Sequence, residues 1–228
     1  MIKKIWCSWF QGYNDLSFPK ENKKYINHWR SLNSNYEFHF ITYDNVSEYL
    51  PKFLKICNKA KHERTMQAQA NLLRLMLLEK YGGVWIDTSL YPVLPLDNFL
   101  HKVINHTGFF TYRFFKRDIG REICNWFLAV DRPYHELIKK WRAAYQERFK
   151  HSLAKDFNQG LRYYESHRDL TKLYDTDQNI KKIIDDMVQI NVDIPLSAGF
   201  NFKEYKHIYG QWKSRQDSFM YKRPIFGK

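Results

Sequence analysis

The order of apolar and polar residues divides the first hundred positions into strands and helices that alternate along the chain. Residues 2–10 form an apolar, aromatic-rich run closed by Gln11-Gly12, which is typical of a buried strand that ends in a loop. Later apolar residues recur three and four positions apart, as on one face of a helix, or alternate with polar ones, as in a strand. The pattern predicts strands at 2–10, 36–43 and 84–86 and helices at 19–32, 46–58 and 65–81, the 46–58 helix being interrupted near Pro51.

This order of strand, helix, strand, helix and strand is typical of a parallel α/β sheet. The helix at 65–81 is followed by Gly82-Gly83, where a left-handed C-terminal cap is expected. The short apolar strand after these glycines ends at Asp87. Because ligands of such sheets bind beyond the carboxyl ends of the strands, we expect Asp87 to lie at a ligand site.

The pattern changes in the second half of the chain, and no linker or repeat separates the halves, so we predict a single domain over residues 1–228. Pro133 should lie in the first turn of an amphipathic helix. We predict strands at 107–115 and 123–130, a helix at 133–149, mostly helix at 157–187, and a strand or loop at 190–202. The 133–149 helix should direct inward Leu137, Ile138, Trp141 and Tyr145.

The composition excludes several classes of protein. With 44% apolar residues, seven prolines and nine glycines, the 228-residue chain is neither disordered nor fibrous. No apolar run approaches the roughly 18 residues of a membrane-spanning helix, and the first apolar run is too short for a signal peptide. Cys7, Cys57 and Cys124 are odd in number and widely spaced, so we expect reduced thiols and a cytoplasmic protein.

The charge implies an anionic partner. Lys and Arg number 37 against 24 Asp and Glu, a net charge of +13. Such a surplus attracts nucleic acid, anionic lipid or small phosphorylated substrates, and it does not choose among them.

Arg74 is the only polar residue between Leu72 and Leu78, in a helix that is apolar nearly all round. Such a helix is buried, and a buried guanidinium needs an anionic or hydrogen-bonding partner. Gln67, Asn71 and Arg74 also fall on one stripe of the helix. Two readings stay open: an internal ion pair of Arg74 with Glu79 or Asp87, or a polar wall that faces a ligand cleft.

Asp87-Thr88-Ser89 follows a short buried strand. A carboxylate at this position can ligate a hard divalent cation that bridges two phosphates. The commoner role of such an aspartate is to cap a turn, here before Pro92.

Together these features resemble a known family. Residues 70–74 (Ala-Asn-Leu-Leu-Arg) and 77–89 (Leu-Leu-Glu-Lys-Tyr-Gly-Gly-Val-Trp-Ile-Asp-Thr-Ser) are similar to the central motif of DxD-type sugar transferases. This glycosyltransferase family contains yeast mannosyltransferases and the related bacterial capsular polysaccharide synthesis proteins. Its motif is a small residue, Ser-Asp, two apolar residues and Arg, then Tyr-Gly-Gly-aromatic-apolar-Asp-x-Asp. Segments 4–12, 125–129 and 163–167 also resemble the capsular group.

The resemblance implies a GT-A-like fold: a nucleotide-sugar-binding α/β sandwich with a mainly parallel central sheet and a helical C-terminal elaboration. Residues 1–105 would form the nucleotide-sugar-binding half, and residues 106–228 the acceptor-side half with a basic tail. The family uses a divalent metal, manganese or magnesium. The implied contacts are Asp87 to the metal or ribose, Arg74 to the donor sugar or diphosphate, Asn71 in the sugar pocket, Trp9 and Gln11 near the base, and His207 with Trp212 as a late metal or diphosphate contact.

Two positions depart from the family pattern. The second Asp of the DxD motif is Ser89, and a hydroxyl is a poorer ligand for a hard cation, so we expect weak metal affinity or a water-mediated contact. The Asp before the Arg is Asn71, whose amide donates as well as accepts hydrogen bonds. Since this position faces the donor sugar in the family, the departure leaves the identity of the sugar open.

Sugar transfer places growing negative charge on the diphosphate leaving group, and a metal together with Arg74 is suited to stabilise it. A retaining enzyme, as in the yeast-type family, needs no strong general base, whereas an inverting enzyme needs a carboxylate near the acceptor. Asp131 is a candidate base, but it precedes Arg132-Pro133 and is better explained as a helix N-cap.

Asn125 is the third candidate catalytic residue, beside Asp87 and Arg74, because its amide can hold a sugar hydroxyl at a strand end. Its neighbour Trp126 either stacks on a pyranose ring or belongs to the core.

We therefore predict a hexosyltransferase-type glycosyltransferase that moves a sugar from a UDP-linked donor to a growing bacterial surface polysaccharide: capsule, O-antigen or lipooligosaccharide. We expect a metal-dependent, retaining reaction in the cytoplasm, with a saccharide acceptor that is free or lipid-linked and peripheral contact with the anionic inner face of the plasma membrane. The cationic side of the 134–148 helix is either solvated or a contact with such lipid; it carries Lys139, Lys140, Arg142 and Arg148.

Two alternatives belong to other classes. A basic nucleic-acid-binding protein would explain the net charge of +13, but the basic residues are scattered and no helix-turn-helix, zinc, RNP or KH signature occurs, so we expect no nucleic-acid partner. A metal-dependent nuclease would need clustered carboxylates. The only acidic doublet is Asp185-Asp186, which has the pattern of a helix surface.

Overall fold

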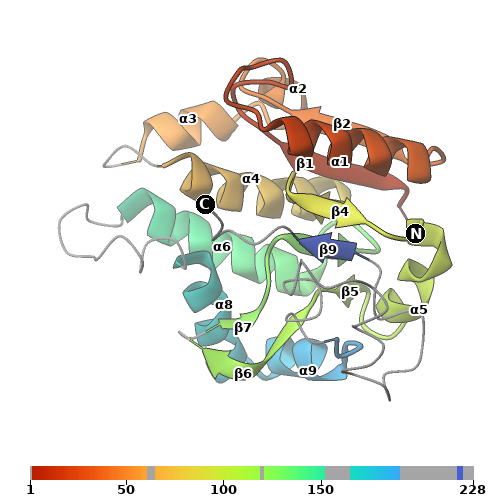
Figure 1. The fold of residues 1–228 in the computed structure, drawn as a ribbon. Helices are drawn as coiled ribbons and strands as arrows, with labels where there is room; N and C mark the ends of the chain where they lie inside the picture. The colour runs from red at the N-terminus through yellow and green to blue at the C-terminus, as the bar shows by residue number, and fades with distance from the viewer. Residues whose placement is uncertain (1, 61–64, 119–120, 152–164, 191–219, 223–228) are drawn as a thin grey trace.

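A five-stranded sheet forms the centre of the protein (Figure 1). The computed structural model describes residues 2–60, 65–118, 121–151, 165–190 and 220–222. The strands lie in the order β2-β1-β3-β8-β5. Their bounds are β1 Lys4–Ser8, β2 Glu37–Ile41, β3 Gly83–Ile86, β5 Phe109–Phe110 and β8 Phe127–Val130. The long helices beside the sheet are α1 Lys20–Leu32, α4 Met66–Tyr81 and α6 Glu136–His151.

Four of the five strands of this sheet point the same way. β1 pairs in parallel with β2 and with β3. β8 pairs antiparallel with β3 and with β5, so β8 is the one reversed strand of the sheet. This arrangement confirms the prediction of an α/β fold with a mainly parallel central sheet.

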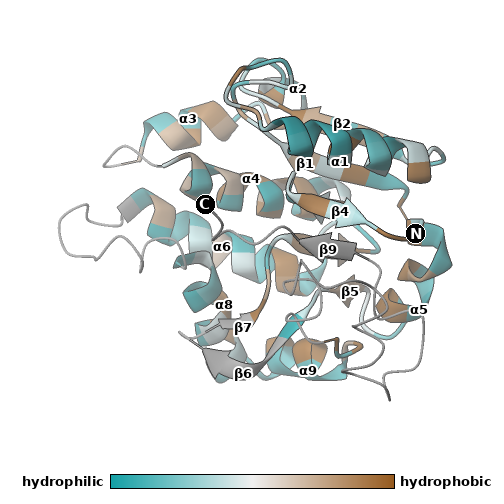
Figure 2. Ribbon diagram, in the orientation of Figure 1, coloured by the Kyte–Doolittle hydropathy of each residue, from teal (hydrophilic) through white to brown (hydrophobic). Residues whose placement is uncertain are grey.

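Helices cover both faces of the sheet. Ile26 and Trp29 of α1 pack on one face, in a core cluster with Ile5 of β1. α4 and α6 pack on the other face, in a second cluster that contains Trp6 of β1. Side chains alternate along a strand, so the neighbours Ile5 and Trp6 belong to opposite layers. Figure 2 shows the viewed side of α1 in mainly hydrophilic colours, as expected for the solvent side of an amphipathic helix.

Shorter elements surround this sandwich. β4 begins one residue after Ser89 and pairs antiparallel with β9 near the end of the chain. β6 and β7 pair with each other. Their bounds are β4 Leu90–Pro92, β6 Arg113–Asp118, β7 Arg121–Ile123 and β9 Met220–Lys222. The remaining helices of the described residues are α2 Val46–Tyr49, α3 Phe53–Asn58, α5 Leu100–Ile104, α8 Glu165–Thr176, α9 Gln178–Asp186 and the 3-10 turn η1 Leu96–Asn98.

α4 begins and ends at residues that the sequence marks. The Oγ1 atom of Thr65 accepts the N–H of Ala68 at 3.2 Å, as an N-cap does. Gly82 and Gly83 follow the helix with φ of 65° and 90°, in the region that favours glycine. A Cβ on Gly83 would lie 2.6 Å from the carbonyl oxygen of Lys4 on β1. The two glycines therefore let the chain turn from α4 into β3 directly beside β1.

The second half is helical where helices were predicted among the described residues, and α6 has its predicted inward face. The inward side chains of α6 are at most 1% exposed, and they are Leu137, Ile138, Trp141 and Tyr145. α8 and α9 confirm mostly helical structure within 165–187, whereas 157–164 and 191–202 lie outside the described residues. Within the part that the structure describes, no helix has the length and apolarity needed to cross a membrane.

Two predictions near residue 133 are wrong. α6 begins at Glu136, so Pro133 precedes the helix instead of lying in its first turn. Asp131 is therefore too far from the helix to cap it, and its carboxylate pairs with the neighbouring Arg132 at 2.9 Å. Tyr134 has a φ of 55°, a left-handed conformation that breaks the helical path before α6 begins.

The predicted strands at 107–115 and 123–130 are each split in two. Their outer parts, β5 and β8, pair in the central sheet, whereas β6 and β7 form a separate hairpin. Asn125 and Trp126 consequently lie in a bend before β8 and not inside a strand. Strands from both sides of residue 105 belong to the one central sheet.

Gly83 offers a test of the close approach between β3 and β1. We expect Gly83→Ala to lower the free energy of unfolding by about 3 kcal/mol, because it combines a left-handed φ with a backbone clash. Gly12 also has a left-handed φ, of 104°, but a Cβ there would meet nothing within 4 Å. Gly12→Ala should therefore cost only about 1 kcal/mol. Urea denaturation measures both values, and equal losses would contradict the clash with Lys4.

Candidate active site

A cavity of about 340 Å³ lies at the carboxyl ends of β1 and β3. Its lining comes from residues 8–11 at the end of β1 and after it, Trp85 of β3 and residues 87–89 after that strand, one face of α4, Asn22 of α1 and Asn125 before β8. Because β8 runs antiparallel to β3, its first residues lie at the same edge of the sheet as the last residues of β3. The volume is within the range of small-molecule sites, which begins at about 300 Å³.

The cavity lies where the order of the sheet changes direction. From β1 the chain passes through α1 to β2 on one side, and it later returns to β3 on the other side of β1. The carboxyl ends of two such neighbouring strands diverge, which leaves a crevice between their loops. The position of the cavity therefore follows from the topology.

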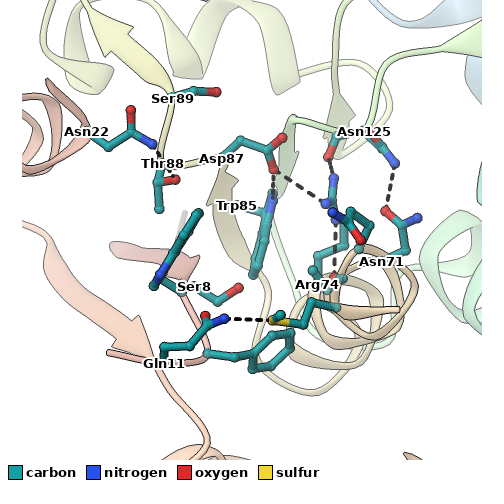
Figure 3. A pocket seen from close by; sticks show the side chains of 15 residues that line it. Ser8, Gln11, Asn22, Asn71, Arg74, Trp85, Asp87, Thr88, Ser89 and Asn125 are labelled. Atoms are coloured by element: carbon teal, nitrogen blue, oxygen red, sulfur yellow. Dashed lines mark hydrogen bonds and ion pairs between the residues drawn. The ribbon is translucent and has the colours of Figure 1, made fainter. Parts of the chain in front are cut away.

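Arg74 fulfils both readings that its sequence left open. Its guanidinium is buried, with the residue 6% exposed, and Nη2 lies 3.4 Å from Oδ1 of Asp87. Nε donates to the carbonyl of Ala70 at 3.3 Å, Nη1 donates to the carbonyl of Asn125, and the ring centroid of Trp85 is 5.0 Å away. The same side chain lines the cavity (Figure 3). The ion pair is thus part of the cavity wall.

The other predicted partner of Arg74 is excluded. Glu79 pairs with Arg142 of α6, where Nη2 lies 2.9 Å from Oε1. This ion pair joins α4 to α6 away from the cavity.

Asp87 closes a turn and faces the cavity at the same time. Its carbonyl accepts the N–H of Leu90 at 3.0 Å, which forms the turn through Thr88 and Ser89. Its carboxylate accepts the indole N–H of Trp85 at 3.1 Å and is 27% exposed at the side-chain level. Ser89 lies on the cavity wall as well.

The predicted polar stripe of α4 is confirmed, since Gln67, Asn71 and Arg74 all line the cavity. Asn71 accepts a hydrogen bond at Oδ1 from Nδ2 of Asn125 at 3.0 Å. Asn125 therefore binds Asn71 through its side chain and Arg74 through its backbone (Figure 3). Trp126 is 6% exposed and stacks on Tyr112 at 5.0 Å, so it belongs to the core.

Trp9 and Gln11 lie at the β1 side of the cavity. The indole N–H of Trp9 donates to Oγ of Ser17 at 3.3 Å, and its ring lies 5.2 Å from Phe18. Gln11 is exposed and its Nε2 lies 2.9 Å from Sδ of Met66. The loop after β1 thus holds one fixed aromatic ring and one accessible amide.

His207 and Trp212 lie outside the described residues, so their predicted roles stay predictions.

Asn22 and Thr88 are among the cavity residues that the sequence analysis did not assign to the site. Asn22 and Thr88 are 6% and 8% exposed, and Nδ2 of Asn22 donates to Oγ1 of Thr88 at 3.1 Å. This bond ties α1 to the turn that carries Asp87. Asn22 lies one helical turn before Ile26, on the inward face of α1. A polar amide on the inward face of an amphipathic helix was the sequence signal that could have identified it.

The cavity has little charge of its own. Among the described lining residues, Arg74 and Asp87 are the charged ones. Burial raises the pKa of the Cys7 thiol beneath the site, opposed by Arg30 and reinforced by Asp87, so this thiol stays neutral and is no nucleophile. The described residues contain no group of three or more His, Cys, Asp or Glu that could hold a metal ion.

The oxygen atoms available as metal ligands therefore suit only a cation that is also held by a bound substrate. The carboxylate of Asp87 and the hydroxyl of Ser89 are hard oxygen donors, but they are few. Magnesium in particular is commonly held by one or two carboxylates together with substrate phosphates. The residues fit a cation that takes most of its ligands from a bound diphosphate.

Known proteins resemble the chain in sequence and in fold. The model of a family described as capsular polysaccharide synthesis protein matches residues 1–222. The initiation-specific alpha-1,6-mannosyltransferase of Candida albicans is 30% identical over 103 residues, which are 43% of this chain and 26% of that protein. The O-glycosyltransferase braB of Annulohypoxylon truncatum is 31% identical over 96 residues, 38% of this chain and 23% of that protein. The chain thus spans about a quarter of the curated relatives it matches.

A solved structure named PaToxG Glycosyltransferase covers 80% of this chain and 72% of its own, with a TM-score of 0.52 and 15% identity. At this identity the likeness concerns the fold. It confirms the predicted fold class, since the structural neighbour is a glycosyltransferase.

The bond between Asn22 and Thr88 can be tested by two substitutions. Thr88→Val leaves Nδ2 of Asn22 without a partner in a buried place, and we expect a loss of about 1–3 kcal/mol in the free energy of unfolding. Thr88→Ser keeps the hydroxyl and removes one methyl group, for a loss of about 0.8 kcal/mol. Urea denaturation compares the two variants, and a valine variant as stable as the serine variant would show that the hydrogen bond adds nothing.

Proposed function

The chain belongs to the family of capsular polysaccharide synthesis proteins, and we propose that it is a glycosyltransferase that moves a sugar from a UDP-linked donor to a growing bacterial surface polysaccharide. One observation carries the proposal: Arg74 of α4 and Asp87 of the turn after β3 meet in one cavity at the switch point of the sheet. A cation and a carboxylate at this position are suited to a diphosphate and its counter-ion.

In this proposal Arg74 stabilises the leaving group. Transfer breaks the bond between the anomeric carbon and the diphosphate, so negative charge grows on the diphosphate oxygens. The Arg74 guanidinium is already held by Ala70, Asp87 and the carbonyl of Asn125, and its position therefore needs no reorganisation when that charge develops.

Asp87 and Ser89 are the proposed metal ligands, with manganese or magnesium as the cation. A bound divalent cation would neutralise part of the diphosphate charge. Because Ser89 replaces a carboxylate, we expect weak affinity for the metal in the absence of the donor. His207 belongs to the same proposal from sequence alone.

The described lining supports a retaining reaction. An inverting enzyme needs a second carboxylate as general base near the acceptor, and the described cavity wall contains no carboxylate besides Asp87. Asp131, the candidate base, comes directly after the end of β8, whereas Asn125 lies before the beginning of that strand. The two ends of β8 lie at opposite edges of the sheet, so Asp131 is placed away from the cavity.

The remaining roles divide the cavity between base and sugar. Trp9 and Gln11 after β1 are proposed to bind the base, while Asn71 and Asn125 are proposed to bind the donor sugar. A ring and accessible amide suit a nucleobase, and paired amides suit sugar hydroxyls.

Location and acceptor also belong to the proposal: cytoplasmic, with a saccharide acceptor that is free or lipid-linked. The membrane contact rests on the net charge of +13. The cationic side of α6 supports it little, because three of its four cations have ion-pair partners within the protein. These pairs are Lys140 with Glu136 and Asp177, Arg142 with Glu79, and Arg148 with Asp169.

The acidic doublet on which the nuclease alternative rests is engaged in ion pairs on the protein surface. Asp185 pairs with Arg113 at 3.0 Å and Asp186 pairs with Lys182 at 2.8 Å. Both carboxylates lie on α9, where they form these ion pairs instead of a cluster that could hold a metal.

A donor panel tests the proposal. We expect a UDP-sugar at about 100 times its Kd to add about 2.7 kcal/mol of stability and so to raise Tm by about 5–10 °C. Manganese should increase this shift, whereas GDP- and CDP-sugars should give less. Binding of DNA or RNA with no response to any nucleotide-sugar would favour the nucleic-acid alternative.

Asp87→Ala and Arg74→Ala should each lower UDP-sugar hydrolysis or transfer by about 100-fold or more, since both groups act on the diphosphate charge. Arg142→Ala is the matched control, because it removes another arginine of a helix that is paired with a carboxylate but does not line the cavity. Activity in the Arg74 variant equal to that in the Arg142 variant would contradict the proposed role.

A further inference from the structure

The cavity has a second polar pair, Asn22 and Thr88, on the side away from Arg74. In Figure 3 these two residues lie on one side of Asp87, whereas Arg74 lies on the other. Asn22 belongs to α1 and Thr88 to the turn after β3, and both side chains line the cavity. The proposed contacts to base, diphosphate and sugar leave this side of the cavity unused.

Asn22 is a polar residue on the buried stripe of α1. The stripe consists of Asn22, Ile26 and Trp29, which are the buried residues of this helix. Ile26 and Trp29 belong to the core, whereas Asn22 lies at the end of the stripe, in the first turn of α1. Burying an amide costs free energy unless its polar atoms find hydrogen-bond partners. Asn22 is therefore placed where the apolar core meets the polar cavity.

The hydrogen bond between the two side chains leaves part of their bonding capacity unused. Nδ2 of Asn22 donates to Oγ1 of Thr88 at 3.1 Å. The Thr88 hydroxyl still has its proton to donate, and Oδ1 of Asn22 still has its lone pairs to accept. No hydrogen bond among the described residues uses either of these, and Oδ1 is not sealed in the interior. The pair therefore presents one hydrogen-bond donor and one acceptor to the cavity.

The pair lies between the two ends of a nucleoside diphosphate bound as proposed above. Thr88 directly follows Asp87, the proposed ligand of the cation on the diphosphate. Asn22 follows the loop that holds Trp9, the proposed contact of the base, whose indole N–H donates to Oγ of Ser17 shortly before α1 begins. In a nucleotide the ribose joins the base to the diphosphate. The ribose therefore falls between these contacts, beside Asn22 and Thr88.

We propose that Asn22 and Thr88 bind the ribose of the donor nucleotide and select for its 2′ and 3′ hydroxyls. This role rests on the proposed function, in which the donor is a nucleotide-sugar. One hydroxyl donates to Oδ1 of Asn22, and its neighbour accepts from the hydroxyl of Thr88. The hydrogen bond between the side chains holds acceptor and donor side by side, as neighbouring hydroxyls require. Such a site rejects a ligand without the hydroxyls, because its own polar groups are then left unpaired.

Free nucleotides test this role without any transfer reaction. We expect the wild-type protein to bind UDP about 10-fold to 100-fold more tightly than 2′,3′-dideoxy-UDP, since two hydrogen bonds are lost. Asn22→Ala and Thr88→Val should each reduce this ratio of Kd values about threefold to tenfold, the effect of one hydrogen bond. Thr88→Ser keeps the hydroxyl and should keep the wild-type ratio. Isothermal titration calorimetry in the presence of manganese measures each Kd.

The matched control is Asn33→Ala. Asn33 is a buried asparagine at the other end of α1, 2% exposed, whose Nδ2 donates to the carbonyl of Trp29 at 3.1 Å, and it does not line the cavity. Its loss should leave the ratio unchanged even where it lowers stability. If Asn22→Ala and Thr88→Val weaken UDP and dideoxy-UDP equally, the pair only shapes the turn that carries Asp87, and the ribose role is overturned.

A panel of nucleoside diphosphates separates this role from the proposed function. A wild-type protein that binds UDP and dideoxy-UDP equally well keeps the function and loses the ribose site, with no variant needed. Equal binding of ADP, GDP and UDP, each weakened in its dideoxy form, keeps the ribose site and contradicts the UDP-linked donor. A protein that binds no nucleoside diphosphate loses both.

Discussion

The buried charge of Arg74 is the constraint on which the arrangement of the site depends. A guanidinium in an apolar helix has no water to solvate it, and leaving such a charge unpaired costs about 3–5 kcal/mol. Its partners come from three elements: Ala70 from α4 itself, Asp87 from the end of β3 and the carbonyl of Asn125 from before β8. Satisfying one charge thus draws a helix and two strands together at one edge of the sheet.

The parts of this site that sequence could predict have local signals. Arg74 is conspicuous as one cation among leucines, and Asp87 as a carboxylate directly after a buried strand. The hydrogen bond between Asn22 and Thr88 has no such signal, because it forms only when α1 packs against the turn after β3. The inward position of Tyr145 followed from helical spacing, but which carbonyl its hydroxyl meets depends on how α6 lies against α4.

The fold shows the same division between local and distant information. The parallel strands β2, β1 and β3 follow from the order of strand and helix patterns over the first hundred residues. The reversed strand β8 does not, because its neighbours in the sheet, β3 and β5, are chosen by packing and not by pattern. The reversal has a chemical result: a strand that runs backward begins where the others end, and this brings Asn125 to the cavity. The start of α6 was predicted wrongly at Pro133, because a proline is common both in the first turn of a helix and in the irregular chain before one.

The pairing of β9 with β4 bears on the order in which the protein is completed during synthesis. β4 begins directly after Ser89, whereas its partner β9 comes much later in the chain, at Met220–Lys222. A ribosome releases a chain from its N-terminus at about 5–20 residues per second, so β1, β2 and β3 leave it well before β9. The strand next to the Asp87 turn therefore stays without its partner until residues 220–222 have been synthesised, so this edge of the site is completed after the parallel strands that carry it.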